Sequence, residues 1–215
     1  MRKIYAILFL MLVSPFIFST AFAWDGEPAF DDISRAQIQS NADEMIYLRW
    51  SPAVDINIYH AFGLSSTYHA GTEYVGMPYS YAEPPEDITE FLNLVAQTRP
   101  PRKLFLHWGN DCSAFVSMCW ELDARLTTHD FFNDSQPNGP HRYCTQLGDV
   151  GEARTVDLRL GDALVADNFH IVMFVEYADD GIWVMENSWR KAKYAKYAWA
   201  DLSSYKPIRR NRLLD

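Results

Sequence analysis

An amphipathic helix that begins at a cysteine and precedes two β-rich runs limits the fold of this chain more than any other feature. Residues 112–126 (CSAFVSMCWELDARL) space their apolar side chains as a helix does, with Asn110 or Asp111 placed to cap its start. The β-rich runs follow at 163–177 and 182–189, and the Ala-Asp-Asp-Gly between them is a hairpin signal. This order predicts an α+β fold, with the helix packed on an antiparallel sheet.

The rest of the chain gives weaker signals. Residues 32–48 space their apolar side chains as a helix does, behind Asp31 or Asp32 as the N-cap. Residues 50–76 mix aromatic, Gly and Ser residues and predict irregular structure with short extended pieces. Residues 130–155 are rich in Asn, Asp, Gly and Pro and predict a loop.

The first 23 residues have the plan of a secretory signal. Basic Arg2 and Lys3 precede an apolar stretch over residues 4–18, and small residues lead to Ala23. We therefore expect cleavage after Ala23 and export to the periplasm or the extracellular space, with no membrane span left in the mature chain. An uncleaved anchor is the competing interpretation. The remaining 24–215 has the length of a single domain with a sizeable core.

The charge balance argues against one class of partner. The whole chain has a formal net charge of −9, and loss of the signal makes it more acidic. Nucleic-acid binding depends on neutralising phosphates, so we expect none. No HExxH, CxxC or other close ligand spacing connects the histidines and cysteines, so neither a catalytic metal nor any cofactor is predicted.

Cys112 is the candidate nucleophile. At the first turn of a helix, unpaired N–H groups and the helix dipole favour a negatively charged thiolate. A thiol nucleophile needs a base, and His170, at the start of a strand, is the strongest candidate. The plainer alternatives are a structural cysteine and a strand-edge histidine that hydrogen-bonds locally.

The cysteine count supports this assignment. Three cysteines in an exported protein leave at least one thiol outside an intrachain disulfide. Cys119 lies seven residues after Cys112, about 10 Å along a helix, too far to share its reaction. We expect a Cys119–Cys144 disulfide, formed in the oxidising compartment, or else a buried Cys119 thiol.

Three motifs resemble the NlpC-type cell-wall peptidases, a branch of the papain-like cysteine peptidases. Asn-Asp-Cys-Ser-Ala-Phe-Val at 110–116 is similar to the family's nucleophile motif, and Leu-Gly-Asp-Ala-Leu at 160–164, followed by the His170 strand, is similar to its Gly-Asp turn and histidine strand. Met-Pro-Tyr-Ser-Tyr at 77–81 resembles its upstream Pro-Tyr motif, which implies that Tyr79 lines the active site. The resemblance implies a papain-like fold, a Cys112–His170 pair and no cofactor.

Two features depart from that family. Ala114 stands where the nucleophile motif usually has Gly, a mild change because Ala is the better helix former. Tyr79 and Cys112 are 33 residues apart, a longer gap than is common in the family. Residues 84–101 lie in this gap, with a short helix expected at 86–97 and Pro-Pro pairs at both ends. We expect an insertion there that rims or covers the substrate cleft. Residues 24–76 form an N-terminal extension outside the resemblance.

A third polar residue is expected to orient His170, and two neighbours compete for this role. Asn187, in Asn-Ser-Trp, resembles the papain-type residue, whereas Glu186 matches the varied polar residue of NlpC-type relatives. Neighbouring strand residues point to opposite faces, so only one of the two is expected to face His170. A carboxylate holds an imidazolium more strongly, which favours Glu186 slightly.

The expected reaction is cleavage of an amide through an acyl-enzyme on Cys112. The resemblance implies a peptidoglycan stem or cross-link peptide as substrate. One alternative is an amidase, or an acyl or glutamyl transferase, acting on a substrate other than peptidoglycan. Another, of a different class, is a cell-wall binding module without catalysis.

Overall fold

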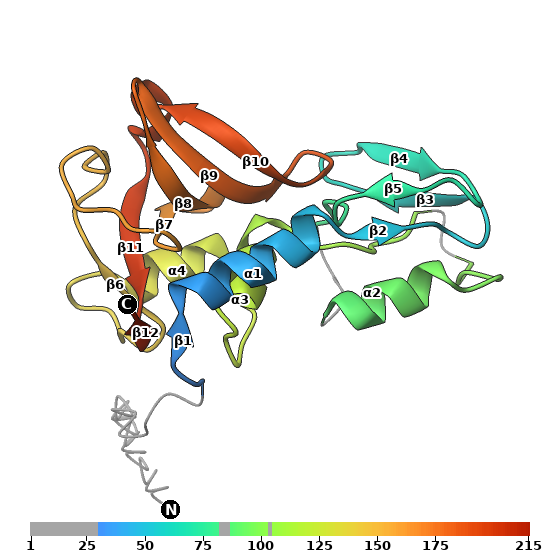
Figure 1. Cartoon of the computed structure of the whole chain (residues 1–215), viewed down its shortest axis with the longest axis horizontal. Coiled ribbons are helices and arrows are strands. Elements are labelled where there is room, and N and C mark those ends of the chain that lie inside the picture. The colour runs from blue at the N-terminus through green and yellow to red at the C-terminus, as the bar shows by residue number, and fades with distance from the viewer. Residues whose placement is uncertain (1–29, 82–86, 103–104) are drawn as a thin grey trace, which may run out of the picture.

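The computed structural model describes residues 30–81, 87–102 and 105–215 and shows an α+β protein. Its largest element is a six-stranded sheet in the order β10-β9-β8-β7-β11-β6, in which every neighbouring pair is antiparallel (Figure 1). These strands are β6 (Cys144–Gln146), β7 (Ala163–Ala166), β8 (His170–Ala178), β9 (Gly181–Ser188), β10 (Lys191–Ala198) and β11 (Lys206–Arg210).

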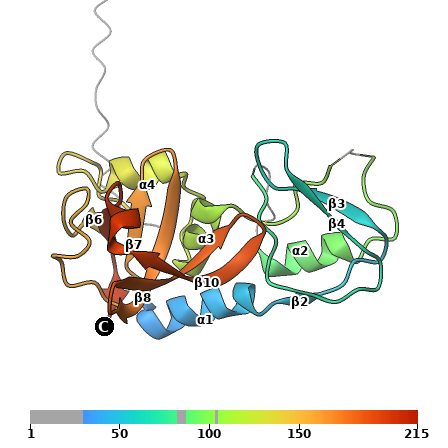
Figure 2. The same ribbon diagram turned by 90° about the horizontal axis from the view of Figure 1, so that it is seen from above.

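Helices cover one face of this sheet. α3 packs against β8 and β9, α1 packs against α3 and β10, and α4 packs against β6 and β7. Figures 1 and 2 show these helices along one side of the sheet, with α2 at the far end of the molecule. The helices are α1 (Arg35–Ile46), α2 (Ile88–Val95), α3 (Cys112–Cys119) and α4 (Thr128–Asp134), with a 3₁₀ turn η1 (Trp199–Leu202) after β10.

Three small strand pairs complete the described structure. The strands β1 and β12 pair in parallel near the two ends of the described chain, whereas β2–β5 and β3–β4 are antiparallel pairs beside α2 (Figure 1). Their bounds are β1 (Ile33–Ser34), β2 (Arg49–Trp50), β3 (Ile56–Tyr59), β4 (Ser65–Tyr68), β5 (Tyr74–Val75) and β12 (Leu213–Leu214).

The large sheet is buried on both faces. Met173 and Met185 are directly opposite each other on β8 and β9 and belong to the core shared with α1 and α3. Phe174 and Val184, the next pair, belong to a second core that includes Leu202 of η1. Because side chains alternate between the faces of a strand, this register also decides where each residue near the end of β9 points.

The helix of residues 32–48 forms, but with a different cap. α1 begins at Arg35, and Ser34 is its N-cap, with Oγ accepting from the Gln37 N–H at 3.1 Å. The expected caps, Asp31 and Asp32, precede the helix. The short strand β1 includes Ser34 and pairs with β12, so strand pairing delays the helix start.

The helix of residues 112–126 is shorter than its pattern indicated. α3 ends at Cys119, and Glu121, just beyond it, has a left-handed φ of 49°. The Leu126 N–H then donates to the Ser117 Oγ, so the chain folds back along the helix instead of extending it. The contact between Leu126 and Ser117 therefore accompanies the end of the helix at Cys119. The spacing of apolar residues in the sequence does not predict such a contact.

Residues 130–155 were wrongly predicted to be only a loop. They contain most of α4 and all of β6. A capping box supports α4, in which the Asp130 carboxylate accepts from the Thr127 N–H at 2.8 Å and the Thr127 hydroxyl accepts from the Asp130 N–H at 3.1 Å. This Thr-x-x-Asp signal was visible in the sequence but was outweighed by the loop-like composition.

Two other expectations concern segments that are only partly described. Residues 1–23, the expected signal, lie outside the described residues, and so do 84–86 of the expected insertion. Within residues 87–101 the short helix is present as α2, capped by Asp87. None of the helices in the described ranges is both long and apolar enough to cross a membrane.

Candidate active site

Cys112 is the first residue of α3. The N-cap Asp111 accepts hydrogen bonds from the Ala114 N–H at 2.7 Å and the Ser113 hydroxyl at 2.9 Å. This cap fixes the first turn and leaves the thiol of Cys112, 5% exposed, at the positive end of the helix dipole. The local sequence therefore places a nucleophile where negative charge is stabilised.

His170 is the first residue of β8 and lies opposite Ala166 of β7. Its Nε2 is 2.7 Å from Oε2 of Glu186. Burial lowers the pKa of His170, but hydrogen bonds to Cys112 and Glu186, together with their negative charges, outweigh burial and raise it to about 9. Since Glu186 occupies Nε2, the nitrogen left for the thiol is Nδ1. The ring therefore links a thiol to a carboxylate.

Glu186 is 2% exposed and is held by several donors. Besides His170, the Ser188 hydroxyl donates to Oε1 at 2.6 Å and the Tyr197 hydroxyl donates to Oε2 at 2.8 Å. The Lys193 ammonium lies 3.4 Å from Oε1. Burial alone would raise the pKa of Glu186, but these hydrogen bonds and the charge of His170 lower it to about 2. Glu186 is therefore ionised at neutral pH.

Asn187, the competing candidate, points to the other face of the sheet and does not contact His170. Its amide nitrogen donates to the backbone carbonyl of Asn110 at 2.9 Å and also to the Asn110 side-chain oxygen. Asn110 precedes the helix that begins at Cys112. Asn187 therefore braces the approach to the nucleophile, and the alternation of side chains along β9 explains why Glu186 alone reaches the imidazole.

Tyr79 lies beside Cys112 in an extended segment whose backbone is hydrogen-bonded to neighbouring segments on both sides. Its N–H donates to the Arg190 carbonyl at 2.8 Å, and its carbonyl lies 2.6 Å from Nδ1 of the buried His60. Tyr79 also bridges in parallel to Asn110. Burial and then the charge of Cys112 raise the pKa of the Tyr79 phenol, which is consequently neutral.

Gly109 allows this segment to approach the nucleophile. Its φ is +130°, a backbone conformation that residues other than glycine rarely adopt. A Cβ at this position would also overlap the carbonyl of Pro78. The Asn110 N–H donates to the same carbonyl at 3.1 Å. A glycine three residues before the first residue of the helix is therefore required for the contact between the Tyr79 segment and the start of α3.

Two hollows flank the reactive groups. The first has a volume of about 440 Å³ and opens on His170. The second, about 920 Å³, opens on Cys112 and includes Asp111, Arg125 and His129. Both hollows contact Ala61, Phe62, Tyr79 and Phe169, so they form neighbouring parts of one surface region.

Sequence reasoning missed several of these groups. Ser188 and Tyr197 contact Glu186 directly, and His60 holds the backbone of Tyr79. Ser188 follows Glu186 at strand spacing, a signal that was available. The pairing of β9 with β10 brings Tyr197 to Glu186, and that pairing has no local signature.

The expected rim of the cleft was wrong for the described part of the insertion. None of residues 87–101 lines either hollow, and Phe91 of α2 packs against Trp50 instead. The rim comes from the turn between β3 and β4, which contributes Phe62 and Leu64. Part of the N-terminal extension therefore forms the cleft wall.

The expected Cys119–Cys144 disulfide is not present, and all three cysteines are free. Cys144 Sγ lies 3.7 Å from the Phe131 carbonyl and 3.6 Å from the Asp134 carboxylate, whereas Cys119 ends α3. Burial is the main cause that raises the pKa of both Cys119 and Cys144 far above the ordinary range. These thiols are therefore protonated core side chains.

The described ranges, 30–81, 87–102 and 105–215, contain no group of three or more His, Cys, Asp or Glu side chains arranged to hold a metal ion. Comparison of this chain with protein-family models, curated proteins and solved structures finds no match. The geometry and the sequence motifs are therefore what a functional proposal rests on.

Proposed function

We propose that this protein is a cysteine hydrolase in which Cys112 is the nucleophile, His170 the general base and acid, and Glu186 the residue that orients His170. The observation that carries the proposal is the hydrogen-bonded chain from Glu186 to the ring of His170, with Cys112 on the other side of the ring. A buried, ionised carboxylate bonded to an imidazole beside a cysteine at a helix start is the arrangement that a cysteine hydrolase needs to orient its base.

The reaction would proceed in two balanced steps. The sulfur of Cys112 attacks the carbonyl carbon of an amide, the C–N bond breaks, and the imidazolium of His170 protonates the departing amine. Water then attacks the thioester while His170 takes its proton, the acid leaves, and the proton returns to the sulfur. The backbone N–H of Cys112, at the unpaired start of α3, is placed to stabilise the oxyanion.

The family and substrate form a finer part of the proposal. The cysteine at a helix start, the histidine strand and the Pro-Tyr segment beside them support a papain-like fold of the NlpC type. Within that family the substrate is a stem or cross-link peptide of peptidoglycan, and residues 1–23 would direct the enzyme to it by export. An amide or ester outside peptidoglycan is the second candidate, because the hollow beside His170 is largely apolar.

The first test is chemical labelling of the mature protein. We expect iodoacetamide to modify Cys112 rapidly at pH 6 and His170→Ala to slow this by a hundredfold or so, the lower range of general-base effects. The buried Cys119 and Cys144 are internal controls and should stay unlabelled until the protein unfolds. Labelling of Cys112 at equal rates in both proteins would contradict the thiol–imidazole pair.

The second test concerns the substrate. The wild type, but not Cys112→Ala, should release peptides from purified sacculi, as measured by mass spectrometry of the soluble fraction. Fast labelling of Cys112 without peptide release would move the proposal to the amidase or transferase alternative. Slow labelling together with sacculus binding unchanged in Cys112→Ala would favour a binding module without catalysis.

A further inference from the structure

The smaller hollow is bordered by large apolar side chains that are open to solvent. Phe62 is 97% exposed, Leu64 52%, Phe169 74% and Trp189 75%. All four line the same hollow as His170, and we call them the apolar rim. Apolar side chains scattered singly over a surface need no explanation, but a cluster beside reactive groups indicates a binding surface.

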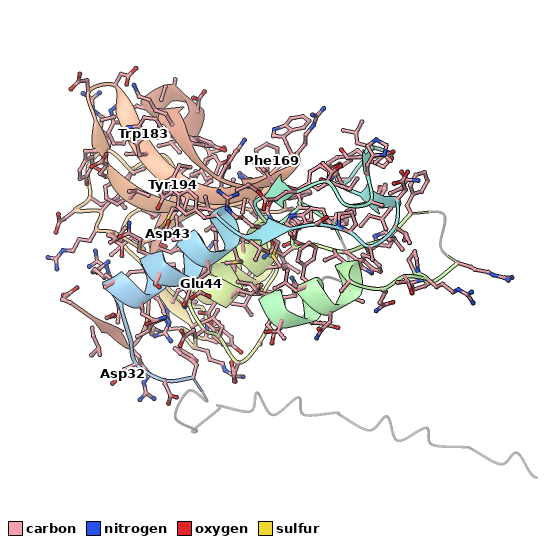
Figure 3. The ribbon with its side chains drawn as sticks, turned by 45° about the vertical axis from the view of Figure 1, so that its right-hand side comes forward. Asp32, Asp43, Glu44, Phe169, Trp183 and Tyr194 are labelled. Atoms are coloured by element: carbon pink, nitrogen blue, oxygen red, sulfur yellow. The ribbon has the colours of Figure 1, made fainter. Side chains whose placement is uncertain are left out.

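The rim is assembled from three separate turns. Phe62 and Leu64 lie between β3 and β4, Phe169 between β7 and β8, and Trp189 between β9 and β10. Figure 3 shows Phe169 where the large sheet meets the β3–β4 pair, and Trp183 farther out on the sheet. Segments far apart in the sequence therefore each contribute one or two apolar side chains to one place.

Two residues of the apolar rim have backbone conformations that are unfavourable for bulky side chains. Phe62 has a φ of 51° and Trp189 a φ of 58°, in the left-handed region where Gly and Asn fit best and bulky residues are uncommon. Neither side chain gains burial that would offset this strain. Residues that are both strained and exposed do not contribute to the stability of the fold, which points to a role in binding.

The charges in the two hollows differ. Among the described residues, no Lys or Arg lines the hollow beside His170, the acidic residue there is Asp201, and Tyr197 and Tyr205 form part of its wall. The neighbouring hollow beside Cys112 contains Asp111 and Arg125. Away from the imidazolium of His170, a ligand in the first hollow gains from apolar burial and meets no Lys or Arg among the described residues, so this part of the hollow favours an uncharged, apolar group.

We propose that the hollow beside His170 binds an aliphatic acyl chain of the substrate and places its carbonyl carbon at Cys112. This inference rests on the proposed cysteine hydrolase function and specifies its substrate as an acyl amide or ester. The hollow's 440 Å³ lies within the range of about 300–1,000 Å³ found for small-molecule sites. Its continuity with the imidazole places one end of the chain at the reactive groups.

The test is a chain-length series of p-nitrophenyl esters, from acetate to octanoate, kept below their micelle-forming concentrations. Each methylene group that enters the hollow should raise kcat/KM roughly threefold, because its surface leaves water. Rates are normalised to the fraction of Cys112 that reacts with iodoacetamide. Cysteine hydrolases form the same thioester from esters and amides, so the series reports the acyl site alone.

Two variants remove the expected gain by different means. Trp189→Asn deletes the indole and keeps a residue that accepts the left-handed turn, and Leu64→Asp places a charge at the rim. Both should flatten the dependence of kcat/KM on chain length. Trp183→Asn is the matched control, since Trp183 is 40% exposed on the same hairpin and lines neither hollow.

Binding is also measured without turnover, so that failure of the two proposals can be told apart. Measured by calorimetry, octanamide should bind the Cys112→Ala variant more tightly than acetamide does, and the Trp189→Asn change should remove that difference in affinity.

A flat ester series with normal Cys112 labelling, or equal affinity for both amides, would overturn the acyl site and leave the hydrolase proposal standing. Preference for N-acetylglucosamine over octanamide, or a rate gain only above the micelle concentration, would overturn it too. Slow labelling with selective octanamide binding would overturn the hydrolase alone.

Discussion

Glu186 is a buried carboxylate that stays charged because polar groups surround it. Three side-chain hydrogen bonds and a nearby ammonium compensate its burial, so the charged form persists where an isolated carboxylate would take up a proton. Because Glu186 is bonded to Nε2 of His170, it fixes the orientation of the ring and stabilises its proton. The sequence motif Glu-Asn-Ser-Trp contains two candidates for this role, and hydrogen bonding distinguishes them.

The first prediction concerns the proton on His170. Glu186→Gln removes the negative charge bonded to Nε2, so the pKa of His170 should fall from about 9 by a unit or more. The measurement is an NMR titration of the imidazole ring. Asn187→Ser, a change on the opposite face of the same strand, is the control and should leave this pKa near its wild-type value. An unchanged pKa in Glu186→Gln would contradict the assigned role of the carboxylate.

The second prediction concerns the pH dependence of stability. The raised pKa of His170 contributes stability that is complete below its ordinary value of 6.5 and is lost as pH rises through about 9. The lowered pKa of Glu186 contributes stability that is complete above 4.5 and is lost as pH falls through about 2. Urea denaturation should therefore show the largest loss for Glu186→Gln relative to wild type between pH 4.5 and 6.5. A loss that stayed constant from pH 2 to pH 10 would contradict the linkage.

At the scale of elements, the site depends on how closely irregular segments approach α3. The Pro78 to Tyr79 segment is hydrogen-bonded to residue 110 on one side and to residue 190 on the other, and Asn187 braces the same place from β9. A helix start and a strand end are rigid, whereas the Pro78 to Tyr79 segment is positioned by these contacts and by the contact of the Tyr79 carbonyl with His60. We therefore expect this close backbone approach to be sensitive to mutation.

The third prediction tests this approach at Gly109. Gly109→Ala adds a Cβ that overlaps the Pro78 carbonyl and also requires an unfavourable φ, so it should reduce stability by about 1–3 kcal/mol and slow Cys112 labelling at least tenfold. Gly71→Ala is the matched control, because Gly71 also has a positive φ, of 70°, but no atom lies within 4 Å of its Cβ position. It should reduce stability without affecting labelling. Equal effects of the two changes on labelling would refute the positioning role of Gly109.

At the scale of the whole molecule, one buried carboxylate joins distant parts of the chain. Asp162, fully buried in the Gly-Asp turn, accepts two hydrogen bonds from Arg209 of β11, at 2.8 and 2.7 Å, and one from Arg35 of α1 at 3.1 Å. The turn before β7 is thereby tied to the first helix and to a late strand. The Gly-Asp motif thus has a structural role away from Cys112.

The fourth prediction follows from this network. Asp162→Ala leaves two arginines without their shared buried partner and should reduce the free energy of unfolding by about 3 kcal/mol or more, as measured with urea. Asp157→Ala is the control, because Asp157 pairs with Arg159 at the surface, where its side chain is 76% exposed, and should cost well under 1 kcal/mol. Similar losses for both variants would show that the network does not connect the molecule as described.

The sequence alone determined the helix that begins at Cys112, the β8–β9 hairpin and the strand that begins at His170. Each of these depends on local signals: an N-cap, an Asp-Asp turn and β-branched runs. It also predicted that only one of Glu186 and Asn187 would face His170, because side-chain alternation is a local rule.

Only the tertiary structure decided which one does, since that depends on the pairing of β9 with its neighbours. Tertiary structure also separated Cys119 from Cys144, brought Tyr197 to Glu186, and formed the cleft wall from the β3–β4 turn instead of the described residues of the insertion. Contacts between residues far apart in the chain leave no periodic pattern, because they depend on how completed elements pack.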